Sequence, residues 1–207
     1  MAQTAYSVNT VGVVSVHPSN GNYVCISNPL TNTSVANTLG NLLGTNLPVN
    51  GKVLKWNYAA VHFDIYTRVV FGNGWIPTTA PMATLNPGEG FFVLSPAQIT
   101  NTFVGDVLDA RYYGIQTNSL RSGFELVGSK QPLTGTVFDL GFNIPLGLSP
   151  QNQILKWNVG SQRYDIYNRC DCGGHYWLPS IPIINVGEGF FTHLDFPYTW
   201  VQNFTVQ

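Results

Sequence analysis

The sequence has little charge. Asp, Glu, Lys and Arg make up 9% of its 207 residues, and the net charge is −1. An ordinary soluble domain carries roughly 25% charged residues. Lys and Arg form no cluster, which argues against nucleic acid as a partner because phosphates attract concentrated positive charge. No basic amphipathic stretch and no run of 18 apolar residues occurs, so we expect neither membrane-surface binding nor a membrane span.

Cysteine is scarce, and nucleotide motifs are missing. The sequence contains no Gly-x-Gly-x-x-Gly before a helix, no Walker motif and no Gly-x-Ser-x-Gly, so we expect no nucleotide cofactor and no nucleophile elbow. A disulfide from Cys25 to Cys170 or Cys172 would suit an oxidising compartment and would leave one thiol over. Alternatively, Cys170, Cys172 and His175 could ligate a soft metal, although this spacing is a weak match and no fourth ligand is evident.

Apolar residues are plentiful at 44%, and aromatic residues reach 13%, which is enough for a substantial core and too many for a disordered chain. Apolar and polar residues alternate in short runs between turns rich in Pro, Asn and Gly, which predicts β-strands. One window, residues 34–44, has helical spacing, with Ser34 as the expected cap and Gly44 as the expected end. We therefore predict a mainly β protein with at most one short helix in each half.

An internal repeat organises the chain. Residues 86–92, Asn-Pro-Gly-Glu-Gly-Phe-Phe, return as residues 185–191 with six of seven residues identical. Residues 54–66 and 155–167 share seven of thirteen residues. The sequence predicts two tandem antiparallel β repeats, sandwich-like or barrel-like and related by a pseudo-twofold axis, over residues 1–104 and 105–207. Only one Phe of each pair can face its own core, so the other must be covered by a second layer, the sister repeat or a neighbouring molecule.

A similar strand pattern occurs three times, at residues 9–12, at 101–105 and in degraded form at 203–206. Two repeats would then share the middle strand, which would end the first repeat and begin the second. The N-terminal strand, expected over residues 6–16, could pair with the C-terminal strand or with a neighbouring molecule. An unpaired strand edge is a ready template for strand addition.

The repeated Lys-Trp-Asn, Asp-Ile-Tyr, Gly-Trp-x-Pro and Asn-x-Gly-Glu-Gly-Phe-Phe motifs resemble a duplicated repeat of secreted, mostly uncharacterised bacterial proteins. The opening residues 6–12 also resemble the start of their mature forms. The resemblance implies secretion by a bacterium and carries over no functional residue. Low charge, β patterning and loops rich in Asn and Thr also favour an extracellular or cell-surface protein. The second copy departs from the pattern at residues 170–175.

Four charged positions are present in both repeats and account for eight of nineteen charged residues. They are Lys55 and Lys156, Asp64 and Asp165, Arg68 and Arg169, and Glu89 and Glu188. The Asp and Glu of each repeat could act as a glycosidase-like acid/base pair or could bind Ca²⁺ with Asn side chains. Alternatively, the Glu accepts turn N–H groups and pairs with Lys or Arg. Duplication favours the structural interpretation, because an enzyme seldom needs its active site twice.

Aromatic residues are duplicated as well. Trp75 and Trp177 follow glycine-rich turns, and with Tyr66 and Tyr167 they could offer exposed platforms for a polysaccharide. Alternatively, these rings belong to the core of each repeat. The composition, the duplication and the spare terminal strand favour a non-enzymatic extracellular structural protein that assembles with itself into a fibre or coat through β edges. A carbohydrate-binding module and a hydrolase using the duplicated carboxylates are the alternatives.

Overall fold

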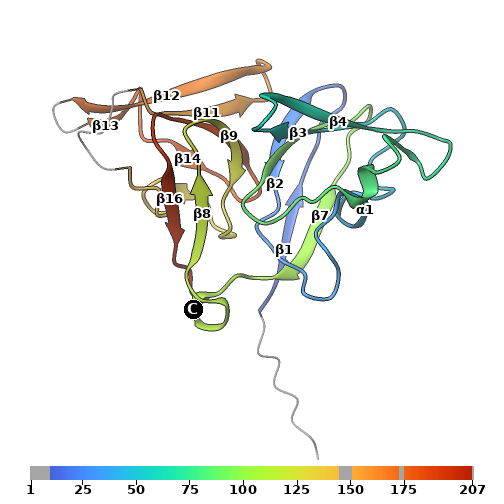
Figure 1. The fold of residues 1–207 in the computed structure, drawn as a ribbon, viewed down its shortest axis with the longest axis horizontal. Helices are drawn as coiled ribbons and strands as arrows, with labels where there is room; N and C mark the ends of the chain where they lie inside the picture. Colours follow the sequence, from blue (N-terminus) through green and yellow to red (C-terminus); the bar gives the residue numbers. More distant parts are fainter. Residues whose placement is uncertain (1–9, 145–150, 173–174, 207) are drawn as a thin grey trace, which may run out of the picture.

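The computed structural model describes residues 10–144, 151–172 and 175–206. The side chains of residues 171–175 are not among the described parts. The structure confirms the mainly β prediction (Figure 1). The elements of the first half are β1 (Val11–Val16), β2 (Tyr23–Ser27), α1 (Leu39–Leu42), β3 (Lys52–Asn57), β4 (His62–Arg68), β5 (Trp75–Ile76), the 3-10 helix η1 (Ala80–Met82), β6 (Gly90–Leu94) and β7 (Asn101–Asp106).

The second half begins after the short helix α2 (Ala110–Tyr113), which connects the halves. Its strands are β8 (Gln116–Leu120), β9 (Gly123–Gly128), β10 (Gly135–Thr136), β11 (Gln153–Asn158), β12 (Arg163–Cys172), β13 (His175–Leu178), β14 (Ile183–Ile184), β15 (Gly189–Leu194) and β16 (Tyr198–Gln202). We call β1–β7 the first lobe and β8–β16 the second lobe.

Each lobe contains a five-stranded antiparallel sheet, and the two sheets have matching strand orders. The order is β2-β6-β3-β4-β5 in the first lobe and β9-β15-β11-β12-β13 in the second. A two-stranded ribbon accompanies each sheet, β1–β7 in one lobe and β8–β16 in the other. In Figure 1 the five-stranded sheets spread along the upper side of the molecule, and both ribbons lie beneath them. The pseudo-twofold relation itself stays a prediction.

Strand β1 pairs within the chain, but with a different strand from the one expected. It runs antiparallel to β7, from Val11 opposite Asp106 to Val16 opposite Asn101. The prediction of a strand shared between the repeats is wrong, because β8 opens the second lobe as a strand of its own. Residues 203–206 lie outside β16, and Phe204 and Val206 pack against the first core. The expected boundary between residues 104 and 105 falls inside β7.

The predicted helix over residues 34–44 shortens to the single turn α1, whose cap is Thr38 and not Ser34. Residues before it are held in an extended conformation, because Asn37 accepts a hydrogen bond from Leu85 N and Thr38 bridges Thr84. Pairing with this distant segment therefore replaces the first helical turns. A short helix depends on such tertiary contacts, since its own propensity is insufficient.

Three hydrophobic clusters fill the molecule, one inside each lobe and one between the lobes. Phe91 belongs to the first core and Phe190 to the second. Their neighbours Phe92 and Phe191 point the opposite way and meet in the third cluster. We call this third set the inter-lobe cluster; it comprises Cys25, Phe92, Leu126 and Phe191, flanked by Tyr23, Leu54, Trp56, Phe63, Leu155, Trp157 and Tyr164. Of the three covers left open by the sequence, the sister repeat is the one observed.

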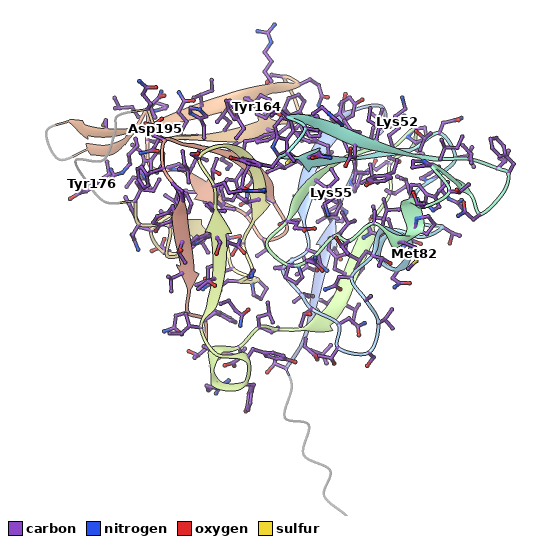
Figure 2. All side chains as sticks on the ribbon, in the orientation of Figure 1. Lys52, Lys55, Met82, Tyr164, Tyr176 and Asp195 are labelled. Carbon is purple, nitrogen blue, oxygen red and sulfur yellow. The ribbon has the colours of Figure 1, made fainter. Side chains whose placement is uncertain are left out.

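Aromatic rings of both lobes interlock in the inter-lobe cluster. Phe92 meets Trp157 edge to face at 5.3 Å between ring centroids, and Phe191 meets Trp56 in the same way at 5.2 Å. Edge-to-face pairs add about 0.5–1.5 kcal/mol beyond the burial of their area. Figure 2 shows Tyr164, which flanks the cluster, at the top of the molecule and midway between its two sides, where the two sheets approach each other. Aromatic packing therefore joins the lobes.

Candidate functional site

The repeated Gly-Glu-Gly segment is a turn that docks onto the opposite lobe. Ser27 N donates to Gly187 O at 2.8 Å, and in the reverse direction Gly128 N donates to Gly88 O at 3.1 Å. The first glycine of each turn has a positive φ, 92° at Gly88 and 74° at Gly187, a conformation that favours glycine. A reciprocal contact between the lobes thus explains why the motif occurs in both repeats.

The second glycine of each turn is required by the closeness of the other lobe. A Cβ on Gly90 would lie 2.6 Å from Val127 O, and one on Gly189 would lie 2.7 Å from Ile26 O. Both distances are shorter than a carbon and an oxygen atom tolerate, and the opposing atoms belong to backbone. Any larger residue would push the two sheets apart.

The glutamates between these glycines hold the turns. Glu89 Oε2 accepts from Asn86 N at 3.0 Å and pairs with Lys55 Nζ at 3.0 Å. In the second lobe, Glu188 Oε2 accepts from Asn185 N at 2.9 Å, and Oε1 lies 3.2 Å from Lys156 Nζ. These contacts stabilise the turn and favour the structural interpretation of the duplicated Lys and Glu.

The duplicated aspartates lie on β4 and β12, within the same five-stranded sheets. Asp64 accepts from Asn57 Nδ2 at 3.2 Å, and Asp165 accepts from Asn158 Nδ2 at 3.1 Å. The pKa of Tyr66 is raised by burial, then by the charges of Asp64 and Glu89.

Tyr167 has the same surroundings in the second lobe, where burial raises its pKa first and Asp165 and Glu188 raise it further. The structure thus brings the Asp and the Glu of each repeat near one tyrosine. Each tyrosine packs at the margin of its lobe's core and is half-buried.

Trp75 and Trp177 are buried, with 4% and 1% of their surface exposed, so their interpretation as sugar platforms is wrong. Each contributes to its own lobe's core. The duplicated arginines lie beside them: Arg68 Nη1 donates to Gly74 O at 2.5 Å, and Arg169 Nη1 donates to Tyr176 O at 2.6 Å. Each guanidinium also lies within 6 Å of its tryptophan ring, at 5.6 and 5.8 Å, which is cation–π range.

Cys25 lies in the inter-lobe cluster and forms no disulfide, so the expected bridge to Cys170 or Cys172 is absent. Burial, and then the charge of Glu188, raises the pKa of the Cys25 thiol, which keeps it protonated and unreactive. Cys170 is buried, whereas the side chains of Cys172 and His175 lie outside the described part. Among the side chains that are described, no group of three His, Cys, Asp or Glu could hold a metal ion.

A groove that no sequence motif predicts opens between the lobes beside the first docking turn. It consists of two adjoining hollows of about 290 and 410 Å³ that share Trp56 and Tyr58. The polar hollow contains Lys55, Glu89, Asn118, Arg121 and Glu125. The apolar hollow is lined by Trp56, Tyr58, Ala59, Val61, Ser122, Gly123 and Phe124. Only the assembled lobes bring these residues together, which is why no motif marks them.

Two contacts fix the walls of this groove. The Arg121 guanidinium lies over the Tyr58 ring at 3.6 Å from the centroid, and Tyr58 Oη donates to Ser122 O at 2.8 Å. Arg121 is itself held by Glu125, whose Oε1 accepts from Nε at 2.7 Å. The second lobe therefore orients a tyrosine of the first, and the groove is formed before any ligand arrives.

No protein-family model, curated protein or solved structure matches the chain. Within the described residues, no helix is both long and apolar enough to cross a membrane.

Proposed function

We propose that this protein is an extracellular, non-enzymatic structural protein that assembles with further copies of itself through the free edge of β1. The observation that carries the proposal is a six-residue strand edge, Val11–Val16, that contains no charged residue and no proline. Natural proteins usually protect such an edge with charge, proline or a covering segment.

The backbone groups of β1 alternate between β7 and the outside. Asp106, which lies opposite Val11, exchanges hydrogen bonds with Thr31 and not with β1. The antiparallel pattern therefore turns the N–H and C=O groups of Val11, Val13 and Ser15 away from β7. Among the described residues these groups have no backbone partner outside the ribbon, so they are available to a neighbouring strand.

The exposed face of the same ribbon is apolar over part of its length, beside Ser15, Thr102 and Asp106. Val11 and Val13 are 62% and 65% exposed, and Val104, directly opposite Val13 on β7, is 55% exposed. A neighbouring strand that paired with β1 would cover these side chains while it satisfied the backbone groups. A second copy of the chain is the favoured occupant, because a surface with so little charge offers weak electrostatic protection from self-association.

The edges of three other strands, β2, β9 and β8, are better protected. The edges of β2 and β9 are partly covered by the docking turn of the opposite lobe. In the ribbon β8–β16, Lys130 Nζ donates to Thr117 O of β8 at 2.7 Å, which places a cation on that edge. The difference between the two ribbons supports β1 as the point of contact between copies.

Electron microscopy and sedimentation of the purified protein over a wide concentration range test the proposal. We expect filaments or larger oligomers for the wild type, and their loss in Val13→Lys, which places a charge on the exposed face of β1. Val201→Lys is the matched control, because Val201 is 45% exposed on β16 and lies outside the proposed contact. A wild type that stays monomeric, or a Val13→Lys protein that assembles normally, would overturn the proposal.

The extracellular location is tested separately by fractionating the source cells. Antibody against the purified protein should detect it in the medium or at the cell surface. Detection in the cytoplasm alone would contradict the location and leave the assembly experiment unaffected.

A further inference from the structure

The connection between β4 and β5, residues 69–74, carries two adjacent apolar side chains that project from the molecule. Val70 is 82% exposed and Phe71 is 63% exposed, and no residue of this connection is charged. Figure 1 shows the connection at the right-hand end of the molecule, beyond β4. We call Val70 and Phe71 the apolar tip. Adjacent apolar side chains on an exposed projection indicate a contact surface, whereas single scattered ones need no explanation.

The apolar tip is held in place by the turn beneath it. Val69 N donates to Gly74 O at 2.9 Å, and Gly74 N donates to Phe71 O at 3.0 Å. The guanidinium of Arg68 fills the inside of the turn, where its Nη1 donates to Gly74 O. A Cβ on Gly74 would lie 1.6 Å from that nitrogen, so only glycine leaves room for the guanidinium. The tip is therefore ordered before any partner arrives, which lowers the cost of binding.

The apolar hollow of the groove has the chemistry to receive such a tip. Seven uncharged residues line it, and its volume is about 410 Å³. Trp56, Tyr58 and Phe124 supply aromatic rings, which favour edge-to-face contact with a further ring. Neither the tip nor the hollow carries a charge, so contact between them buries no unpaired charge.

The apolar tip and the apolar hollow lie at opposite ends of one hairpin. Tyr58, Ala59 and Val61 line the hollow from the turn before β4, and the tip follows the other end of β4. Strand β4 has seven residues and is therefore about 23 Å long. A tip consequently cannot enter the hollow of its own chain, whereas it can enter the hollow of another copy.

We propose that the apolar tip of one copy inserts into the apolar hollow of the next copy. Phe71 packs against Trp56 and Phe124, and Val70 packs against Val61. This contact rests on the proposed self-assembly, but it uses a surface other than the edge of β1. Because the tip and the hollow are different surfaces, the contact repeats from head to tail and extends a filament. Two β1 edges can instead pair with each other and close into a dimer.

The tip contact is small, so it acts together with β1. A stable interface buries about 1,200–2,000 Å² in total, while one aromatic side chain contributes about 150–250 Å². The tip alone therefore gives weak, concentration-dependent association. A second copy is favoured over a lipid surface, because peripheral membrane binding usually adds a basic cluster to the apolar group, and the sequence has none.

Electron microscopy of single variants tests the two surfaces. Phe71→Ser should lose filaments because it removes the ring of the tip, and Val61→Lys should lose them because it places a charge in the hollow. Val61 is 71% exposed, so neither change disturbs a core. Ile115→Ser is the matched control, since Ile115 is 60% exposed between α2 and β8 and should leave assembly unchanged. Normal filaments in Phe71→Ser or in Val61→Lys would overturn the proposal.

Mixing the two deficient variants tests whether the contact runs from head to tail. Phe71→Ser keeps its hollow and Val61→Lys keeps its tip, so a mixed pair forms one contact. Both carry Val13→Lys in addition, which removes the contribution of β1. Sedimentation equilibrium at up to millimolar concentration should show one-to-one association in the mixture and at least tenfold weaker association of each variant alone. A mixture that associates no better than its components would contradict the inference.

The same variants separate this contact from the proposed function. If Val13→Lys assembles normally and Phe71→Ser does not, the β1 proposal fails and the tip contact stands; the reverse result overturns the tip contact alone. Vesicles of phosphatidylcholine and phosphatidylglycerol provide the membrane control. Vesicle binding that Phe71→Ser abolishes, with self-association unchanged, would assign the tip to a lipid surface and overturn the inference.

Discussion

The two lobes make the same docking contact but differ in how far water reaches it. In the first lobe the side chain of Glu89 is 35% exposed and that of its partner Lys55 is 22% exposed. The equivalent Glu188 and Lys156 are 17% and 15% exposed. The wetter pair lies beside the open groove, while Gln162 seals the interface next to the drier lobe. The Lys156–Glu188 contact therefore only joins the lobes, whereas the equivalent Lys55–Glu89 contact also lines a hollow.

This comparison also separates the features that both lobes need from those that only one has. The glycines, the glutamates and the paired phenylalanines have matching contacts in both lobes, which indicates a role in joining them. The turn residues 61 and 162 differ, and Val61 lines the groove while Gln162 bonds to Tyr23. Substitutions in matched pairs therefore measure whether the two sides of the interface are equivalent.

The largest effect is expected from Phe92→Ala and Phe191→Ala. Each ring is about 95% buried in the inter-lobe cluster, and truncation leaves a cavity. Each change should lower the free energy of unfolding by about 3–5 kcal/mol. Urea denaturation followed by tryptophan fluorescence measures this loss. A loss below about 1 kcal/mol in either variant would show that the two lobes do not depend on their shared cluster.

A smaller loss is expected from Gly90→Ala and Gly189→Ala. The added methyl group would meet the backbone oxygen of the opposite lobe, and such overpacking costs about 1–3 kcal/mol. Thermal unfolding should show similar losses for the two variants. Gly160→Ala is the control, because its Cβ would meet only Asn158 Oδ1 at 3.5 Å. If the control lost as much stability as the two variants, close approach would not be the cause.

The connection between the lobes should respond to pH through Asp109. Its carboxylate accepts from Arg111 and from Val206 N, and the Arg111 hydrogen bond is the main cause that holds its pKa well below the ordinary value. A lowered folded pKa stabilises the protein above the unfolded pKa of about 3.9, and this stability is lost as the pH falls through the folded pKa.

Asp109→Asn should therefore lower the melting temperature at pH 7, and the gap to the wild type should narrow steadily below about pH 4. Differential scanning calorimetry across this range measures the gap. The same gap at every pH would indicate that the charge of Asp109 has no part in the stability of the connection.

The smallest effects are expected from Glu89→Gln and Glu188→Gln, and they should be unequal. Exposed ion pairs contribute about 0–1 kcal/mol, whereas hydrogen bonds to buried charged groups contribute about 1.5–3 kcal/mol. The drier Glu188 should therefore cost more than Glu89. Chemical denaturation resolves such a difference. A larger loss of stability in Glu89→Gln would mean that the more exposed ion pair contributes more to the contact between the lobes than the less exposed one does.

The sequence was sufficient for the fold class and for part of the interface. Alternating residues, turn residues and the duplication predicted the β architecture, and the adjacent Phe91 and Phe92 predicted that a second layer must cover one ring. These features are local, since a period of two and a glycine turn are encoded within a few residues. The Lys and Glu of each repeat were assigned a structural role on the same grounds, and their contacts favour it.

Tertiary structure decided which strands pair and which side chains are buried together. The sequence left the C-terminal strand or a neighbouring molecule as the partner of β1, because several strands carry similar patterns, and the structure pairs β1 with β7 instead. Trp75 and Trp177 follow glycine-rich turns yet are buried, because each packs in the core of its own lobe. The Gly-Glu-Gly segment was recognisable as a repeated turn from sequence alone. Its role as the joint between the lobes, and the groove beside Val61, arise only where residues about 40 or more positions apart meet, and local patterns hold no information about that meeting.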